Sequence, residues 1–300
     1  MDIKQSIIVP TYNGSKRIIT LLKALNKQSV TDFELIVVID GSSDNTAEIV
    51  EPYLSQFYSS KIIHQNNQGR SSARNRGAIE SLGATLIFFD DDMEPFCDSV
   101  ERHLNFHKNN SGLLCGNQTE NESAEKTDIQ NYKAFLTKEW TKKYSGDLNR
   151  LNLANLFFTG ANCSMTRNAF EQLKGFDERL TDAEDYDFAY RAIKQNIPVF
   201  FDQRNLAVHN DPITCVSYVK RIRQYERAQQ KLIELHPDRE NRRVTPSAFN
   251  HLAYRFFAFN FLPQAIDRLS IFMAIPKRIR YRLYSIIIQS LAIEFPEVRL

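Results

Sequence analysis

The stretch Leu86–Pro95 reads Leu-Ile-Phe-Phe-Asp-Asp-Asp-Met-Glu-Pro. Four apolar residues in a row suit a strand buried on both faces, and the carboxylates of Asp90, Asp91 and Asp92 follow at once. In an open parallel α/β sheet, ligands bind outside the carboxyl ends of the strands. Closely spaced carboxylates repel one another, and a hard divalent cation, Mg²⁺ or Mn²⁺, would relieve the repulsion. The alternative is a solvated acidic turn, which explains this stretch equally well when it is taken alone.

The chain before this stretch alternates short apolar segments with helical ones. The apolar segments are Ser6–Pro10, Phe33–Ile39 and Lys61–His64. This alternation predicts an α/β fold, with a mostly parallel sheet sandwiched by helices. Each strand is followed by a polar cluster, namely Thr11 to Asn13, Asp40, Arg70 to Arg76, and Asp90 to Asp92. Polar loops explain any one cluster, but a shared ligand site explains why one sheet edge collects them all.

Charge is unevenly distributed along the chain. The net charge is only +2, yet residues 204–300 hold 16 Lys and Arg against 8 Asp and Glu. The pattern beyond Pro212 is wholly helical, and the last stretch, Ile266–Phe295, mixes isoleucines with arginines. A basic helix of that kind can lie in a membrane interface, but it can equally pack on the body or on a partner chain. Solvated helix faces explain the charge as well, and the basic residues belong to no nucleic-acid-binding module.

The four cysteines are far apart in the sequence and form neither a metal-ligand spacing nor a disulfide framework. Their isolation fits a reducing compartment. Ile3–Pro10 is too short and too polar for a signal peptide, and no apolar run reaches the length of about 18 residues that a membrane span needs. We therefore expect a cytoplasmic protein, with peripheral contact to the inner face of the membrane through its basic C-terminal helices.

Seven short segments resemble, in the expected order, the motifs of the family-two nucleotide-sugar glycosyltransferases. They are Ile-Val-Pro-Thr-Tyr-Asn (8–13), Val-Ile-Asp-Gly-Ser-Ser-Asp-Asn-Thr (38–46), Gly-Arg-Ser-Ser-Ala-Arg-Asn-Arg-Gly (69–77), Phe-Phe-Asp-Asp-Asp (88–92), Thr-Gly-Ala-Asn (159–162), Gly-Phe-Asp-Glu (175–178) and Ala-Glu-Asp-Tyr-Asp (183–187). Each is weak evidence alone, but the ordered set is strong. The resemblance implies a GT-A catalytic domain over residues 1–210, with a nucleotide-sugar-binding half (1–95) and an acceptor half (96–210). Residues 211–300 form a helical C-terminal extension that matches nothing.

The resemblance also assigns donor-binding roles. They fall to Pro10, Thr11, Tyr12 and Asn13 around the nucleobase and ribose, to Asp40 on the base, to Arg70 and Arg74 at the nucleotide or its phosphates, and to Asp90 and Asp91 in the acidic triplet. Asp90 and Asp92 match the acidic ends of the Asp-x-Asp motif, which binds Mn²⁺ or Mg²⁺, and Asp92 is the expected direct ligand. His209 falls near the position where some relatives supply a further metal ligand.

Asp185 matches the catalytic base of inverting members of the family. Glu184 and Asp187 are the alternative bases, and the stabilisation of acidic residues at a helix N-terminus is the structural explanation of this cluster. The chemistry asks for these residue types, because a leaving diphosphate needs a cation and a sugar hydroxyl needs a carboxylate to remove its proton. One carboxylate acting on the far side of the leaving group gives inversion.

These arguments predict transfer of a sugar from a UDP-sugar to a hydroxyl of a glycan or lipid-linked acceptor, in cell-surface polysaccharide or glycoconjugate synthesis. A sugar nucleotidyltransferase is the first alternative, but the loop Pro10–Lys16 is poor in the glycine that such an enzyme needs there. A non-catalytic sugar-nucleotide-binding module is the second, although the intact Asp90, Asp92 and Glu184–Asp185 argue against it. Acceptor specificity is expected in residues 117–150 and in the helical extension, with Trp140 packed in the core rather than stacked on a sugar.

Overall fold

The computed structural model describes residues 4–120, 122–123, 125–144, 146–239 and 248–300. The chain forms two compact units, the first made of residues 1–120 and 137–211 and the second of residues 121–136 and 212–300. The expected boundary after residue 210 lies one residue from the point where the chain enters the second unit. Residues 121–136, which we expected in the acceptor half, belong to the second unit instead.

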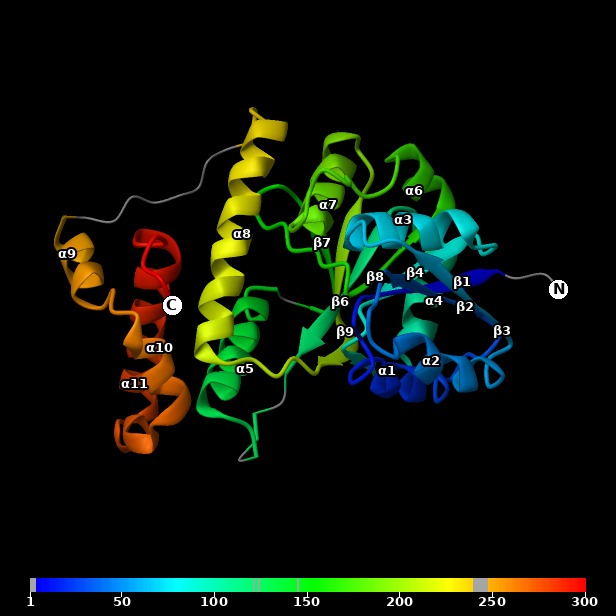
Figure 1. Cartoon of the computed structure of the whole chain (residues 1–300). Helices are drawn as coiled ribbons and strands as arrows, with labels where there is room; N and C mark the ends of the chain where they lie inside the picture. The colour runs from blue at the N-terminus through cyan, green and yellow to red at the C-terminus, as the bar shows by residue number, and fades with distance from the viewer. Residues whose placement is uncertain (1–3, 121, 124, 145, 240–247) are drawn as a thin grey trace. The chain divides into compact units, whose positions relative to one another are not determined.

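The described part of the first unit contains a nine-stranded sheet with helices on both faces (Figure 1). Its strands are β1 (Gln5–Thr11), β2 (Glu34–Asp40), β3 (Ser59–Gln65), β4 (Thr85–Phe89), β5 (Met93–Pro95), β6 (Leu113–Thr119), β7 (Leu148–Leu151), β8 (Asn162–Thr166) and β9 (Val199–His209). Their spatial order is β3-β2-β1-β4-β8-β6-β9-β5, and β7 pairs with β9. The α/β class and the sheet covered by helices on both faces are therefore as the sequence predicts.

The first four strands are mutually parallel, whereas β8 runs antiparallel to its neighbours β4 and β6. The pairing places Asn162, the first residue of β8, opposite Phe89, the last residue of β4. The loop that leads into β8 therefore arrives at the same sheet edge as the aspartates that follow β4. This reversal brings segments some seventy residues apart into one site.

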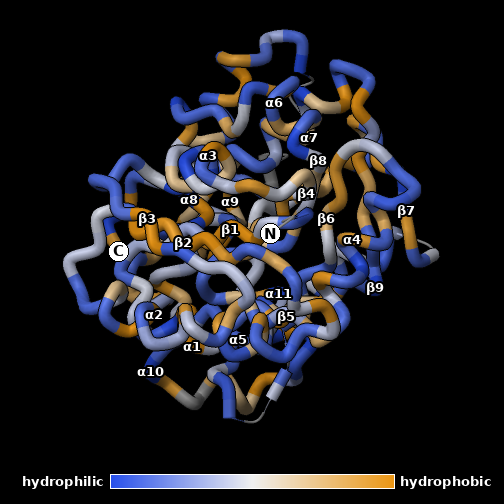
Figure 2. The backbone as a smooth tube through the Cα atoms, turned by 90° about the vertical axis from the view of Figure 1, so that its right-hand side faces the viewer, coloured by the Kyte–Doolittle hydropathy of each residue, from blue (hydrophilic) through white to orange (hydrophobic). Residues whose placement is uncertain are grey.

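Two hydrophobic layers cover the faces of the sheet. The helices of this unit are α1 (Ile18–Leu25), α2 (Thr46–Leu54), α3 (Arg70–Glu80), α4 (Ser99–Asn109), α6 (Arg167–Gln172) and α7 (Glu184–Lys194). On β4, Leu86 and Phe88 pack with residues of α3, α6 and α7, while Ile87 and Phe89 pack with α1, α2 and α4. All four side chains are fully buried, as expected for a strand with two covered faces. Figure 2 shows the resulting hydrophobic colour along β1 and β2.

The second unit is helical. Its elements are α5 (Asp128–Thr141, whose last residues belong to the first unit), α8 (Cys215–Leu235), α9 (Ala248–Phe256), α10 (Phe261–Arg268), the 3-10 helix η1 (Ser270–Ala274), α11 (Lys277–Gln289) and the π-helix η2 (Ser290–Glu294). Asp128 ties α5 to α11, because its carboxylate accepts bonds from Arg280 at 2.9 Å and from the Tyr284 hydroxyl at 2.8 Å. The stretch 266–295 is thus several short elements rather than one helix. Among the described helices, none has the length and apolarity needed to cross a bilayer.

Trp140 lies near the end of α5 and is 56% exposed. The prediction that it packs in the core is therefore wrong. An exposed indole in the region expected to select the acceptor keeps the alternative, stacking on a sugar, open to test.

Candidate active site

The loop after β1 is fastened to its neighbours. Pro10 lies within β1, in register with Val38 of β2. The side-chain oxygen of Asn13 accepts a bond from the Ser43 backbone N–H at 2.8 Å. Tyr12, in contrast, is 49% exposed. Among the four residues predicted to line the nucleobase pocket, Pro10 and Asn13 shape the loop, while Tyr12 presents its ring to solvent.

Asp40, at the end of β2, is buried and fully engaged. One carboxylate oxygen accepts bonds from the Gln65 side chain and the Gln68 N–H, both at 2.8 Å, and the other accepts the Gly69 N–H at 2.8 Å. Gly69 has φ +89°, a left-handed conformation that favours glycine. Asp40 therefore holds the entry to α3 in place. Its predicted contact with the nucleobase stays a prediction.

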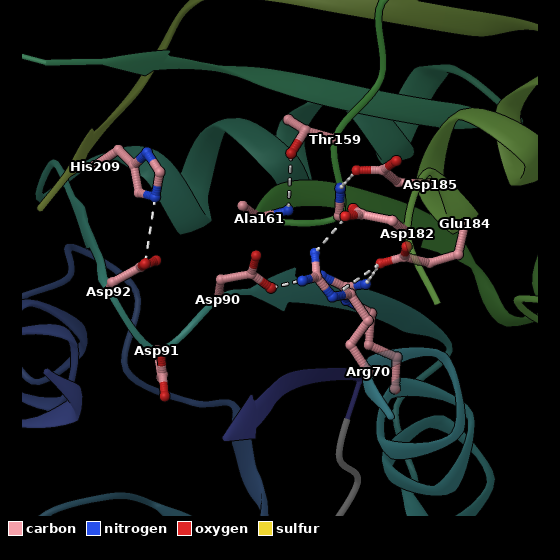
Figure 3. A network of polar contacts seen from close by, with 12 residues as sticks. Arg70, Asp90, Asp91, Asp92, Thr159, Ala161, Asp182, Glu184, Asp185 and His209 are labelled. Atoms are coloured by element: carbon pink, nitrogen blue, oxygen red, sulfur yellow. Dashed lines mark hydrogen bonds and ion pairs between the residues drawn. The ribbon is translucent and has the colours of Figure 1, made fainter. Parts of the chain in front are cut away.

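The three aspartates after β4 point in different directions (Figure 3). Asp91 turns away from the other two and is buried. It accepts bonds from the Thr11 hydroxyl at 2.6 Å and from Arg17 at 3.0 Å. Burial raises the pKa of the Asp91 carboxyl, and the contacts with Arg17 and Thr11 oppose this effect. A Cβ on Gly14 would lie 2.4 Å from Asp91, so this contact needs glycine there. Asp91 thus fastens the acidic loop to the loop after β1.

Asp92 faces His209, the last residue of β9. Asp92 Oδ2 lies 3.3 Å from His209 Nε2, and the other ring nitrogen lies 3.3 Å from Glu120 Oε1. Asp92 Oδ1 is buried and has no hydrogen-bond partner among the described residues. A buried carboxylate oxygen without a partner, next to an imidazole, is a donor set that suits a divalent cation. The described residues nevertheless contain no group of three His, Cys, Asp or Glu side chains arranged as a metal site.

The third predicted ligand, Asp90, faces Arg74 instead. Arg74 lies on α3, is 1% exposed, and places one terminal nitrogen 2.6 Å from Asp90 Oδ1 and the other 2.6 Å from Glu184 Oε1. Burial disfavours the Asp90 carboxylate, but the Arg74 and Arg70 cations outweigh it, so the pKa of Asp90 lies below its ordinary value. Arg70 is more open, with 37% of its side chain exposed and a 3.7 Å distance to Glu184. Of the two arginines predicted to meet the nucleotide, Arg70 has room for a phosphate, while both terminal nitrogens of Arg74 contact carboxylates.

Three motif residues support this ion-pair bridge. A Cβ on Gly160 would lie 2.6 Å from the central guanidinium carbon of Arg74, so only glycine lets the loop before β8 approach it. Asn75 accepts the Phe176 N–H at 2.8 Å and donates to the Phe176 carbonyl at 2.9 Å. The Phe176 ring lies under the guanidinium, 5.5 Å from it. These contacts explain why the three motifs occur together, and the sequence alone does not predict them.

Asp185 lies at the start of α7 and is half-buried. Its carboxylate accepts the Gly160 N–H at 3.1 Å and the Tyr186 N–H at 2.7 Å. Burial and the nearby Glu184 charge raise the pKa of Asp185 to about 6, against the opposing effect of Arg74. A carboxylate with that pKa is a competent general base near neutral pH.

The alternative bases are committed elsewhere. Glu184 is 1% exposed and paired with Arg74, and Asp187 is fully buried and paired with Arg191 at 2.7 Å. Of the three acidic residues at the start of α7, Asp185 is the one that is partly exposed.

The chain is similar to known proteins over much of its length. Residues 6–174 match the family described as Glycosyl transferase family 2. The chain is 26% identical over 262 residues to the uncharacterized glycosyltransferase YfnE of Bacillus subtilis, covering 71% of this chain and 67% of that protein.

Two solved structures share the fold. The mannosyltransferase PcManGT from Pyrobaculum calidifontis, in complex with GDP-Man and Mn²⁺, superposes with a TM-score of 0.63 at 16% identity, covering 100% of this chain and 89% of that one. S. aureus TarS 1-349 in complex with UDP gives a TM-score of 0.52 at 18% identity, covering 98% and 91%.

The family match spans more than half of the chain, and therefore the chain belongs to glycosyl transferase family 2. It is a GT-A-type glycosyltransferase, an enzyme class that the sequence motifs predict. The comparisons give no support to the sugar nucleotidyltransferase or to the non-catalytic binding module.

Proposed function

We propose that this enzyme is an inverting glycosyltransferase that uses a nucleotide-sugar donor, with Asp185 as its general base. The observation that carries the proposal is the position of the Asp185 carboxylate, held by two backbone N–H groups with a pKa of about 6. It is joined to the acidic loop after β4 through Glu184, Arg74 and Asp90. The proposal is supported by this network, because it connects the proposed proton acceptor to the loop proposed to meet the phosphates.

In the proposed reaction, Asp185 accepts the proton of the acceptor hydroxyl as that oxygen attacks the anomeric carbon. The bond between the anomeric carbon and the diphosphate oxygen breaks, and the nucleoside diphosphate leaves with the bonding electron pair. A single displacement inverts the anomeric configuration. Glu184 keeps Arg74 in place, and Arg70 is the cation with room to meet the departing phosphates.

Asp92 and His209 are the residues that would hold a divalent cation, Mn²⁺ or Mg²⁺, with Asp90 as the further ligand that the motif implies. When bound, such a cation supplies Lewis-acid stabilisation of the leaving diphosphate. Magnesium and manganese sites of this kind complete their coordination with phosphate oxygens and water, so two or three protein ligands suffice.

The donor is proposed to be a UDP-sugar, bound between the exposed Tyr12 ring and the edge near Asp40. The structural neighbours were solved with UDP in one case and GDP-Man in the other, so both bases belong in the test. The acceptor is proposed to be a glycan or lipid-linked hydroxyl in cell-surface polysaccharide or glycoconjugate synthesis, with the enzyme acting in the cytoplasm.

The test is the Asp185→Asn variant, with Glu171→Gln as control because Glu171 is an exposed carboxylate of the neighbouring helix α6. Calorimetric titration with UDP-GlcNAc and GDP-mannose, with and without MnCl₂, identifies the donor. Donor consumption is then followed against a panel of sugars and lipid diphosphate sugars. We expect D185N to bind the donor like the wild type but to lose transfer by at least about 100-fold, while E171Q keeps full activity. Normal turnover by D185N would show that the base is another residue.

A further inference from the structure

Exposed apolar side chains are concentrated in one part of the second unit. Fifteen large hydrophobic residues are exposed on the described part of the chain, and seven of them fall within residues 252–279. They are Leu252, Phe256, Phe259, Phe261, Leu269, Met273 and Ile279, with exposed fractions of 49% to 71%. Single exposed apolar residues are ordinary, but a concentration of this kind marks an interaction surface. Figure 1 shows this segment in orange, from α9 through α10 to the start of α11, and three of the seven residues lie in the turns and the 3-10 helix between these helices.

The same segment carries exposed cations. They are Arg255, Arg268, Lys277, Arg278 and Arg282. Lys277 pairs with Glu122, but within the part of the chain that the structure describes the four arginines have no ion-pair partner. The only acidic residue between 252 and 282 is Asp267, whose carboxylate accepts the Cys215 N–H at 2.6 Å and the Val216 N–H at 3.2 Å. The segment therefore presents an excess of positive charge.

Cations and apolar groups alternate closely along the segment. Arg255 precedes Phe256, Arg268 precedes Leu269, and Arg278 precedes Ile279. Leu252 and Phe256, four residues apart on α9, lie on one face of that helix. This pairing suits the boundary of a lipid bilayer, where guanidinium groups meet headgroup phosphates and neighbouring apolar side chains enter the acyl region.

We propose that residues 252–282 form a docking surface for an anionic lipid bilayer, which we call the Arg–apolar surface. A purely apolar partner would leave the four arginines without counter-charges, whereas a layer of lipid phosphates supplies them. The enzyme then rests on the membrane from one side, since none of the described helices can span it. The proposal is independent of the transfer chemistry, because it rests on residues of the second unit alone.

The test is co-sedimentation of the full-length protein with vesicles of phosphatidylcholine alone or mixed with phosphatidylglycerol. Two variants address the two halves of the surface: R255Q/R268Q/R278Q for charge, and F256S/F259S/F261S for apolar contact. The control is I79S/L82S, which removes two equally exposed hydrophobic residues of the first unit, 71% and 67% exposed. Donor binding and the unfolding midpoint are measured for every variant, so that loss of folding is recognised.

We expect the wild type and the control to bind only the anionic vesicles, and binding to fade between about 50 mM and about 500 mM NaCl. The charge variant should bind about 100-fold more weakly, and the apolar variant should also lose binding. No binding at low salt, equal binding to both vesicle types, or wild-type binding by both variants would overturn the proposal. A dimer in light scattering that the F256S/F259S/F261S variant dissolves, without vesicle binding, would assign the surface to a second copy instead and also overturn it.

Discussion

Asp90 and Glu184 share one guanidinium, since each carboxylate lies 2.6 Å from a terminal nitrogen of the buried Arg74. One of these residues follows β4 in the acidic loop, and the other precedes the proposed base Asp185. The two ends of the proposed reaction, the phosphate side and the proton-accepting side, are therefore linked by a single side chain. A change at either end alters the charge that Arg74 presents to the other.

Replacing Arg74 should be costly. Arg74→Met leaves two carboxylates without their shared partner, one of them almost completely buried, and we expect a loss of about 3–5 kcal/mol in the free energy of unfolding. Arg76→Met is the control, because Arg76 lies on the same helix, has a side chain that is 54% exposed and pairs with Glu80. Exposed pairs of this kind contribute at most about 1 kcal/mol. Urea unfolding of both variants measures the difference, and similar losses in the two would contradict a special role for the buried bridge.

The activity should depend on pH through Asp185. The base must be ionised to accept a proton, so kcat should rise with pH through about 6 and level off above it. Because the Glu184 charge helps to raise this pKa, Glu184→Gln should move the acidic limb of the profile to lower pH. The measurement is kcat at saturating donor from mildly acidic to neutral pH. An unmoved limb in E184Q would mean that another group controls it.

Substitutions of the neighbouring aspartates Asp91 and Asp92 should have different effects, one on stability and the other on the Mn²⁺ response. Asp91→Ala leaves the Thr11 hydroxyl and Arg17 without their acceptor, and we expect it to destabilise the fold by about 1–3 kcal/mol while the response of donor binding to Mn²⁺ persists. Asp92→Ala should abolish the Mn²⁺ response and change stability by less than about 1 kcal/mol. Thermal unfolding and nucleotide titration with and without Mn²⁺ distinguish them. His209→Ala should behave like D92A, and a persisting Mn²⁺ response in both would exclude this pair as the metal site.

A buried histidine should make the fold sensitive to acid. His103 lies between the Ser164 hydroxyl and the Asn162 side chain, at 2.8 and 2.9 Å, and burial lowers its pKa to about 3. Between pH 6.5 and that value the unfolded chain binds a proton that the folded one does not, so His103 should cost about 2 kcal/mol of stability on going from pH 7 to pH 5. His103→Gln removes the titration, so the stability of the variant should fall less over this interval. Urea unfolding at both pH values measures the free energy of unfolding of the wild type and of the variant. An equal decrease in the two proteins would contradict the prediction.

Much of the fold follows from local pattern. The run Leu86–Phe89 is apolar at every position because both faces of β4 are covered, and the apolar segments of β1 and β2 are buried in the same way. The polar clusters at their ends meet at one edge because parallel strands end on the same side. These features can be predicted because each depends on the pattern of apolar and polar residues within one segment of the sequence.

Other features depend on partners that no single segment contains. An apolar run does not reveal the direction of a strand, so the sequence did not predict that β8 runs antiparallel to β4. The resemblance marked Arg74 and Gly160 as motif positions. Only the packing shows that residue 160 must be glycine because a Cβ there would clash with the Arg74 guanidinium. Trp140 was expected inside because tryptophan is mostly buried, but α5 leaves it outside. The assignment of residues 121–136 to the second unit likewise arises from tertiary contacts.

The opposition of Phe89 and Asn162 has a consequence for how such enzymes diversify. The pairing of β4 with β8 holds both ends of the intervening chain beside the proposed reaction centre. For a chain closed in this way, doubling the length of a loop costs only about 0.6 kcal/mol of entropy. Insertions between β6 and β8 can therefore accumulate with little penalty while the sheet edge at Phe89 and Asn162 stays unchanged.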